Sequence, residues 1–487
     1  MPAPIVVASN RGPIAFVRGP DGALTAKRGA GGLVTALSGA LAASGGLWIA
    51  SAMTDEDREV ARRGRVDATG GDAPAYALRY LNFEPDQFDR YYNGWANRVL
   101  WFLHHYLWNL PQTPVFGADT EDGWDAFTAV NRTFAETMAE EGGRLGPSAA
   151  FLVQDYHLSL APSMLRELRP GARIAHFSHI PFAGPSYMRI LPEHYRTALL
   201  EGLLGADVVG FHAPAWADRF LLSCRLLAGA RVDLRRRIVR WRGREVRVRV
   251  NPMGLDVEAL RAEAARPEVV RAVEELREWK GDGALLLRVD RAELSKNILR
   301  GFLAFDRFLE ARADWRGRLR FLALLNPSRE DIPEYVAYVD ECVRTAEFIN
   351  ERWGTASWQP VDARVRDEYA QTLAAYTLYD ALVVNPTLDG MNLVAKEGPM
   401  LNTRDGPLIL SETAGAFQEL HRWALPVNPF DVDQTAAAIA SALDMPAEER
   451  AARRRGLRAA VRRNPPSRWL ESQLGDLGLG DRRTVAG

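Results

Sequence analysis

The sequence predicts an α/β protein with two doubly wound, Rossmann-like domains. Short runs rich in Val, Ile and Leu alternate with helix-length segments along most of the chain, which is typical of parallel strands covered by helices on both faces. The chain has 487 residues, 47% hydrophobic and 25% charged, and this length exceeds what a single core normally covers. The expected strands are PIVVAS, AAFLVQD, RIAHFSH, ADVVGFH, ALLLRVD, LRFLALL, ALVVNP and PLILSE.

A punctuated segment near the middle of the chain predicts the domain boundary. Residues 238–250, IVRWRGREVRVRV, alternate with period two around an Arg-Gly pair and predict a hairpin, and residues 251–256, NPMGLD, follow with Pro and Gly. We therefore place an N-terminal domain at residues 1–252 and a C-terminal domain at 253–465. We expect the last helix, within 466–487, to pack back on the N-terminal domain.

Composition narrows the class of partner. The 61 basic and 62 acidic residues nearly cancel, which removes the global field expected of a protein that binds nucleic acid or an anionic membrane. Two distant cysteines without metal-ligand spacing predict neither a disulfide framework nor a zinc site. The start, MPAPIVVASNR, has no basic region before its apolar residues and predicts a first strand. We expect a cytoplasmic protein with small-molecule partners, and the sequence is compatible with a homo-oligomer.

Polar motifs follow the expected strands, where ligands of doubly wound sheets bind. With two such domains, we expect a cleft between the carboxyl ends of their strands. The motifs are SNR at 9–11, QDYH at 154–157, SHIPF at 178–182, RVDRAELSK at 288–296, NPSRED at 326–331 and NPTLDGMNLVAKEGP at 385–399.

Two of the motifs are candidates for anion binding. RGAGGLVTAL at residues 28–37 is a glycine-rich turn before a helix, where backbone N–H groups can approach a phosphate, although such turns also simply connect elements. Arg291 and Lys296 stand five residues apart after a strand and can converge on one anion, or can form surface pairs with acidic neighbours. Arg329 follows the next strand and adds a third cation at the same rim.

The aromatic segment YYNGWANRVLWFLHHY, residues 91–106, has two interpretations. Aromatic side chains of a helix usually serve the core, but Tyr and Trp also line sugar sites with flat rings and polar tips. Tyr92 and Trp101 lie nine residues apart, so on a single straight α-helix they would not share a face.

The carboxylates Asp389 and Glu397 frame a loop and the start of a helix. Glu397 could accept hydrogen bonds from the two hydroxyls of a ribose, and Asp389 could bind sugar hydroxyls, with loop N–H groups near a diphosphate. We interpret the two carboxylates as binding groups and not as an acid/base pair.

Taken together, these motifs resemble the trehalose-6-phosphate synthases, retaining glycosyltransferases of the GT-B fold. DGMNLVAKE at 389–397 matches unchanged, and YYNxxxNxxLW at 91–101, DYHL at 155–158 and HIPF at 179–182 match in order. The resemblance continues through SETAG at 411–415 and covers nearly the whole chain. It implies transfer of glucose from a nucleoside diphosphate glucose to glucose 6-phosphate, giving trehalose 6-phosphate.

The resemblance also implies a donor site. It assigns the diphosphate to Arg291, Lys296 and the turn at Gly31 and Gly32, and the ribose to Glu397. The groups implied around the transferred glucose are His179, Asp389, Gly390, Met391, Asn392, Leu393 and Val394. The implied catalytic residues are Asp155, His179, Arg291 and Lys296.

An acceptor site and a mechanism follow from the same resemblance. The residues implied at the acceptor are Arg11, Trp48, Tyr92, Trp101, Asp155 and Arg329. Neither a metal nor a cofactor is implied, because Arg291 and Lys296 neutralise the leaving diphosphate. The acceptor hydroxyl attacks from the face that the leaving group departs from, so the configuration at the sugar carbon is retained.

The sequence departs from the family pattern at two places, and the second of them concerns the donor base. QDYHL replaces the common His-Asp-Tyr-His-Leu, and Asp362 and Arg364 stand in WQPVDARVRDEY, residues 358–369, where the family usually has apolar and aromatic residues. Asp362 could bind the N–H and amino groups of guanine and Arg364 could stack on the purine, or both could point to solvent. We expect GDP-glucose to be accepted, and a preference for it over UDP-glucose is left open.

Two rival functions are weighed against this prediction. The first is a transferase with another acceptor, such as a glucosylglycerol-phosphate synthase or a pseudo-glycosyltransferase that joins cyclitol phosphates, as in validoxylamine phosphate synthesis. The intact YYN and LW elements argue against it. The second is a non-catalytic sugar-phosphate sensor, and the complete set of donor residues argues against that.

Overall fold

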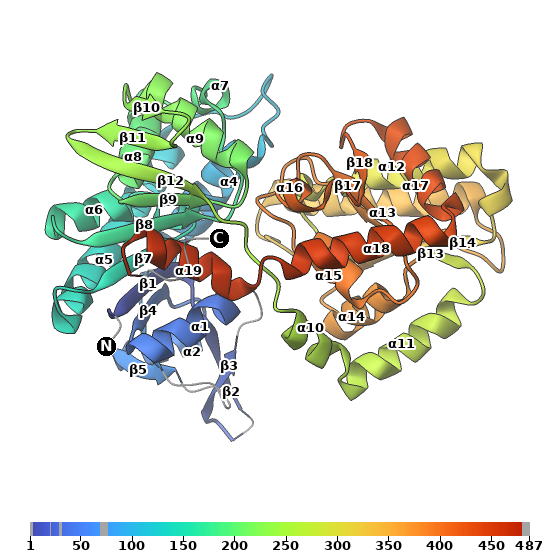
Figure 1. The fold of residues 1–487 in the computed structure, drawn as a ribbon, viewed down its shortest axis with the longest axis horizontal. Helices are drawn as coiled ribbons and strands as arrows, with labels where there is room; N and C mark the ends of the chain where they lie inside the picture. Colours follow the sequence, from blue (N-terminus) through green and yellow to red (C-terminus); the bar gives the residue numbers. More distant parts are fainter. Residues whose placement is uncertain (1–2, 20, 29–31, 69–75, 480–487) are drawn as a thin grey trace. The chain divides into compact units, whose positions relative to one another are not determined.

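The chain forms two compact units in the computed structural model (Figure 1). The described residues are 3–19, 21–28, 32–68 and 76–479. Unit 1 runs to Met253 and is taken up again from Pro466, and unit 2 is Gly254–Pro465. Each unit is built on a sheet of mainly parallel strands, as the apolar runs predict.

Unit 1 contains a ten-stranded sheet in the order β10-β11-β12-β9-β8-β7-β1-β4-β6-β5. Its parallel strands are β1 (Ile5–Arg11), β4 (Leu47–Ser51), β6 (Tyr76–Leu81), β7 (Ala150–Gln154), β8 (Arg173–Ser178), β9 (Val208–Phe211) and β12 (Arg244–Val250). Antiparallel strands complete the edges: β5 (Arg65–Ala68), β10 (Arg231–Asp233) and β11 (Ile238–Trp241). The chain builds outward from β1 through β4 and β6, then returns to add β7 on the other side, so the topological switch point lies between β1 and β7.

Helices cover both faces of this sheet. On one face, α1 (Gly32–Ser44) and α19 (Pro466–Asp476) pack together over the strands, seen in blue and red in Figure 1, and bury Leu41, Trp48 and Trp469 in a shared core. Gly31 lies outside the described residues, so the predicted phosphate contact at the turn before α1 stays a prediction.

The predicted hairpin at 238–250 is confirmed. β11 pairs antiparallel with β12 around Arg242 and Gly243, whose φ values of 44° and 78° are the left-handed pair that a tight two-residue hairpin requires. β12 then runs parallel to β9, which ties the hairpin to the main sheet.

Unit 2 contains a six-stranded parallel sheet in the order β15-β14-β13-β16-β17-β18. The strands are β13 (Ala284–Arg291), β14 (Leu319–Asn326), β15 (Val361–Val365), β16 (Ala381–Val384), β17 (Leu408–Ser411) and β18 (Leu425–Val427). Counted along the chain, this is the Rossmann order 3-2-1-4-5-6, with its switch point between β13 and β16.

The alternation of side chains along β13 divides the core of unit 2 into two layers. Leu285, Leu287 and Val289 pack under one set of helices, while Leu286 packs under the other. The first set is α10 (Val257–Ala264), α11 (Pro267–Lys280), α14 (Tyr369–Leu378), α15 (Val394–Leu401) and α18 (Ala447–Arg462). The second is α12 (Ile298–Ala311), α13 (Pro333–Trp353) and α17 (Val432–Asp444). None of the helices in the described ranges combines the length and the apolar character needed to cross a bilayer.

Candidate active site

The switch point of unit 1 brings two predicted residues, Arg11 and Asp155, to the carboxyl ends of neighbouring strands. β1 ends at Arg11, and β7, its neighbour, ends one residue before Asp155. Asp155 has a φ of 70° and precedes a short 3₁₀ turn, η2 (Tyr156–Leu158). Its Oδ1 accepts the backbone N–H of the next residue at 3.0 Å and that of His179 at 3.1 Å. These two bonds fix the orientation of the carboxylate.

The aromatic segment forms a π-helix, η1 (Arg90–Leu100), that ends just before Trp101. The i→i+5 hydrogen bonds of a π-helix give it a wider turn than an α-helix, so the spacing argument for a straight α-helix does not apply to this segment. Tyr92 stacks on His157 with ring centroids 5.7 Å apart, and Trp101 packs against Tyr156 at 5.9 Å. The segment is therefore not a single straight α-helix, and the premise for placing Tyr92 and Trp101 on different faces does not hold.

Arg11 and Tyr92 meet at this edge, whereas Trp48 does not reach it. Arg11 is exposed, and its Nη2 donates to Tyr92 Oη at 3.2 Å. Trp48 is fully buried in β4, and its Nε1 donates to Ser9 Oγ at 2.7 Å. A side chain without exposed surface cannot contact an acceptor, so the prediction of Trp48 as an acceptor-binding residue is wrong. Trp48 instead supports the end of β1 from within the core.

His179 ends a chain of hydrogen bonds that fixes its tautomer. The backbone N–H of Met253 donates to His212 Nδ1 at 3.3 Å, so the proton of His212 lies on Nε2, 3.2 Å from His179 Nδ1. His179 therefore carries its proton on Nε2 and donates to Gln154 Oε1 at 3.0 Å. Burial, with His176 nearby, lowers the pKa of His179 to about 3. His179 is thus a neutral donor, and its partner is the residue that departs from the family motif.

A buried arginine, Arg288, links the charged segments that follow the strands of unit 2. Arg288 has no exposed surface, and its Nε donates to Asp290 Oδ2 at 2.8 Å. Its Nη2 donates to the backbone oxygen of Lys296 at 2.7 Å and to Asn385 Oδ1 at 2.6 Å, which ties β13 to the end of β16. Arg288 was not predicted. The available signal was a charge inside the apolar run ALLLRVD, because a buried charge needs fixed partners.

Glu293 brings two predicted cations to one point. It is fully buried, and its Oε1 lies 2.9 Å from Arg291 Nη1 and 2.6 Å from Arg329 Nη1. Ser328 Oγ donates to the same oxygen at 2.8 Å. Burial alone would raise the pKa of Glu293, but Arg291, Arg329 and Lys296 outweigh burial and lower it to about 2. The acidic partner anticipated for Arg291 is therefore present, but it is buried and shared.

Lys296 pairs with the other predicted carboxylate. Its Nζ lies 2.6 Å from Asp389 Oδ2, and the two side chains are 12% and 14% exposed. Burial alone would lower the pKa of Lys296, but Asp389 and Asp290 raise it above its ordinary value. Asn392 Nδ2 also donates to Asp389 Oδ2 at 3.0 Å. The structure thus joins the turn after β13 to the loop after β16, at the switch point.

The loop after β16 leads directly into α15. Asn392 has a φ of 75°, and its Oδ1 accepts the backbone N–H of Ala395 at 3.2 Å. Glu397 lies in the first turn of α15, accepts from Tyr376 Oη at 3.2 Å, and has a pKa raised by burial. The other predicted positions of this loop and first turn are Gly390, Met391, Leu393 and Val394.

Asp362 does not supply the expected free carboxylate. It is the second residue of β15, and its Oδ2 accepts from Arg364 Nη2 at 2.7 Å and from Arg364 Nε at 3.0 Å. Arg364 also donates to Gln371 at 2.7 Å and lies over the ring of Trp279 at 5.4 Å. The carboxylate of Asp362 is thus paired within the chain and Arg364 already lies over a protein ring, and their recognition of the base stays a prediction.

A recess of about 260 Å³ lies where β14 and β15 end. Its lining includes Pro327, Tyr335 and Val365, and two exposed acidic residues, Glu330 and Asp340. Neither carboxylate was predicted as a site residue, although Glu330 belongs to the motif NPSRED that follows a predicted strand.

Comparison with known proteins identifies the family. The model of glycosyltransferase family 20 matches residues 3–478. The chain belongs to glycosyltransferase family 20. A trehalose-6-phosphate synthase of Mycolicibacterium paratuberculosis is 36% identical over 484 residues, which covers 96% of this chain and 94% of that protein. A validamine 7-phosphate valienyltransferase of Streptomyces hygroscopicus subsp. jinggangensis is 32% identical over 486 residues, covering 97% and 94%.

A solved structure extends the similarity to the fold. It is an α,α-trehalose-phosphate synthase (UDP-forming) from Burkholderia xenovorans in complex with glucose-6-phosphate, with a TM-score of 0.81, 28% identity, and coverage of 98% of this chain and 100% of that chain. The family 20 membership confirms the resemblance to trehalose-6-phosphate synthases and the prediction of a glycosyltransferase. The structural similarity confirms the GT-B fold.

Proposed function

We propose that this family 20 glycosyltransferase transfers glucose from GDP-glucose or UDP-glucose to glucose 6-phosphate with retention, giving trehalose 6-phosphate. The observation that carries the proposal is the grouping of Arg291, Lys296 and Arg329 around the carboxylates of Glu293 and Asp389. A donor diphosphate and an acceptor phosphate both need such charge-assisted partners. The Mycolicibacterium and Burkholderia proteins, whose names and ligand include trehalose phosphate and glucose-6-phosphate, support the same substrates.

The donor is held by residues of unit 2 in this proposal. Arg291 and Lys296 bind the diphosphate and stabilise the charge that grows on it as the bond to the sugar carbon breaks. Glu397 accepts from the ribose hydroxyls, and Asp389 with the loop that follows it binds glucose. His179 of unit 1 is also assigned to the transferred glucose, and a pKa of about 3 keeps its ring uncharged at neutral pH.

The acceptor phosphate is assigned to Arg329 together with Arg11, Tyr92 and Trp101, and Asp155 binds acceptor hydroxyls. The acceptor oxygen bonds to the sugar carbon on the face from which the diphosphate leaves, and its proton passes to a phosphate oxygen. Positioning and electrostatic stabilisation then account for the rate, and no cofactor or metal is required.

Release of nucleoside diphosphate, measured with and without glucose 6-phosphate, tests the proposal. We expect release to depend on glucose 6-phosphate, to give an α,α-linked product by NMR, and to persist in excess chelator. Release that does not respond to glucose 6-phosphate, or an absolute need for a divalent metal, would contradict it.

The valienyltransferase relative favours a second candidate, a transferase with a cyclitol phosphate acceptor. Its identity over nearly the whole chain is only slightly below that of the trehalose-6-phosphate synthase. A panel of acceptors that contains glucose 6-phosphate and validamine 7-phosphate separates the two candidates by kcat/KM.

The donor base is tested by the ratio of kcat/KM for GDP-glucose and UDP-glucose. Because Asp362 is paired with Arg364, we expect Asp362→Ala to leave this ratio unchanged. If the recess at the ends of β14 and β15 receives guanine, Asp340→Ala should instead lower the ratio, since a carboxylate suits the adjacent N–H and amino groups of that base. If the ratio of kcat/KM changes in Asp362→Ala, Asp362 does contribute to recognition of the donor base.

A further inference from the structure

We propose a second ligand site in unit 1, which binds a multivalent phosphate anion at the amino edge of the ten-stranded sheet. A recess of about 740 Å³ lies there, and four arginines contribute to its lining. We call it the arginine recess; its charged lining residues are Arg166, Arg173, Asp207, Arg244, Glu245 and Arg247.

The topology separates this site from the candidate active site. Arg173 is the first residue of β8, Asp207 directly precedes β9, and Arg244 is the first residue of β12. These strands run parallel to one another, so the recess lies at their amino ends. Asp155 and His179 follow the carboxyl ends of β7 and β8, at the opposite edge of the same sheet.

The carboxylates of the recess do not balance its cations. Asp207 is shared: its Oδ2 lies 2.9 Å from Arg166 Nη2 and its Oδ1 lies 2.8 Å from Arg244 Nη2. The backbone N–H of Ile174 donates to Oδ2 as well, at 2.9 Å. Glu245 is exposed and pairs with Arg240, outside the recess, at 3.4 Å. Of the four guanidinium groups, those of Arg166 and Arg244 therefore share the one carboxylate, Asp207, that pairs within the recess.

Two of the arginines keep most of their donors for a ligand. Arg173 donates through Nη2 to the backbone oxygen of Ser148, and Arg247 donates through Nη2 to that of Asp476. Within the described part of the chain, neither of them pairs with a carboxylate. These hydrogen bonds to backbone oxygens hold each side chain in place. The remaining N–H groups of each guanidinium can then donate to a bound anion.

Crowding of like charges makes an anion favourable here. Burial, and then the positive charge of Arg166, lowers the pKa of Arg244. All four arginines are half-buried, so water screens their repulsion less than at an open surface. A phosphate group accepts planar, two-pronged hydrogen bonds from arginine, and the volume admits a sugar phosphate or a nucleoside diphosphate.

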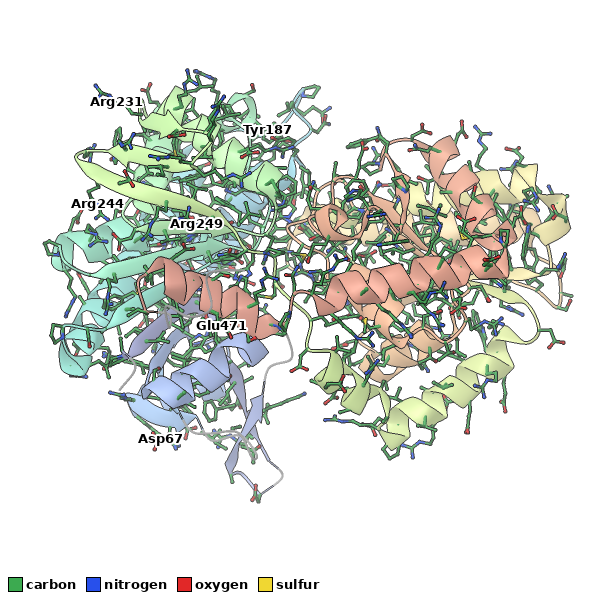
Figure 2. All side chains as sticks on the ribbon, viewed as in Figure 1. Asp67, Tyr187, Arg231, Arg244, Arg249 and Glu471 are labelled. Atoms are coloured by element: carbon green, nitrogen blue, oxygen red, sulfur yellow. The ribbon has the colours of Figure 1, made fainter. Side chains whose placement is uncertain are left out.

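Titration calorimetry of the full chain with inorganic pyrophosphate tests the site. In the wild type we expect a binding event that Arg244→Ala/Arg247→Ala weakens by about a hundredfold, since each charge-assisted contact contributes roughly a factor of ten or more. Arg244→Lys/Arg247→Lys keeps the charge and should lose less. The matched control is Arg231→Ala/Arg236→Ala, which removes two exposed arginines of the same unit; Figure 2 shows Arg231 apart from Arg244.

Binding at the proposed active site is separable from this event. Pyrophosphate bound by Arg291 should be lost in Arg291→Ala and kept in the recess variant, so the recess can hold an anion even if the proposed function fails. Glucose 6-phosphate and ADP as further titrants identify whether a sugar phosphate or a nucleotide binds best. The proposal is overturned if the recess variant and its control bind pyrophosphate with dissociation constants within about threefold of each other.

Discussion

At the scale of single residues, Glu293 shows how this chain pre-arranges two cations. Burying a carboxylate is unfavourable unless charged partners compensate, and here Arg291 and Arg329 compensate at 2.9 and 2.6 Å. The same contacts hold the two arginines, which repel each other, at fixed positions in the free chain. Under the proposed function, Glu293 is a positioning residue for the donor cation and the acceptor cation together.

Glu293→Gln should therefore raise KM for the donor and for glucose 6-phosphate, each by roughly tenfold, because the charge that aligns both arginines is lost. Steady-state kinetics with either substrate varied would measure this. Glu347→Gln, at an exposed position of α13, is the matched control. If KM rises for one substrate only, Glu293 does not position both arginines.

Arg329→Ala separates the acceptor from the donor. The loss of one charge-assisted phosphate contact, roughly 1.5 to 3 kcal/mol, should raise KM for glucose 6-phosphate by about tenfold to a hundredfold. Donor KM should change far less, since Arg291 and Lys296 remain. An unchanged acceptor KM would remove Arg329 from the acceptor site.

At the scale of elements, α18 packs into the core of unit 2 and supports the end of α15, although its sequence is strongly basic. Residues 450–463 carry many arginines, yet Leu457 and Val461 of this helix are buried in the core of unit 2. Arg458 reaches the end of α15, where Nε donates to the backbone oxygen of Pro399 at 2.9 Å and Nη2 to that of Asn402 at 2.7 Å. It thereby satisfies carbonyl groups that the end of a helix leaves without intrahelical partners.

Arg458→Ala should lower the free energy of unfolding of unit 2 by roughly 1 to 3 kcal/mol, because buried carbonyl groups lose their charged donor. Chemical denaturation followed by hydrogen exchange of unit 2 peptides would measure it. The neighbouring, exposed Arg455→Ala is the control and should cost little. Equal stability of the two variants would show that water replaces Arg458.

At the scale of the whole molecule, the histidines are distributed unequally between the two units. Three histidines of unit 1 have pKa values lowered by burial: His104 and His179 to about 3 and His176 to about 4. The only histidine of unit 2, His421, is exposed. In the unfolded chain these histidines take up protons near pH 6.5, whereas in the folded unit they do not.

Unit 1 should therefore lose stability as the pH falls from about 6.5 to about 4, by up to about 1.4 kcal/mol per pH unit for each of the three histidines. Unit 2 should not show this loss, because the lowered pKa of Glu293 matters only below the ordinary glutamate range. Thermal unfolding read separately for the two units by hydrogen exchange checks the difference. A unit 1 whose stability is flat between pH 6.5 and 4 would contradict the buried neutral histidines.

The sequence by itself determined the fold class, the apolar strands, the central hairpin and the family. Fold class, strands, hairpin and family follow from local periodicity and from the order of motifs. Both can be read directly from the sequence. It also picked out Arg291, Lys296 and Arg329, because each follows a strand and the ends of neighbouring parallel strands lie at one edge.

Only the tertiary structure decided what each of these groups meets. Glu293 accepts from both Arg291 and Arg329, Asp389 pairs with Lys296 from 93 residues away, and Asp362 is neutralised by Arg364. The burial of Trp48 and the π-helical form of residues 90–100 were likewise not evident from the sequence. The physical reason is that exposure, ion pairing and helical period depend on packing against elements distant in the chain, and local sequence does not specify those contacts.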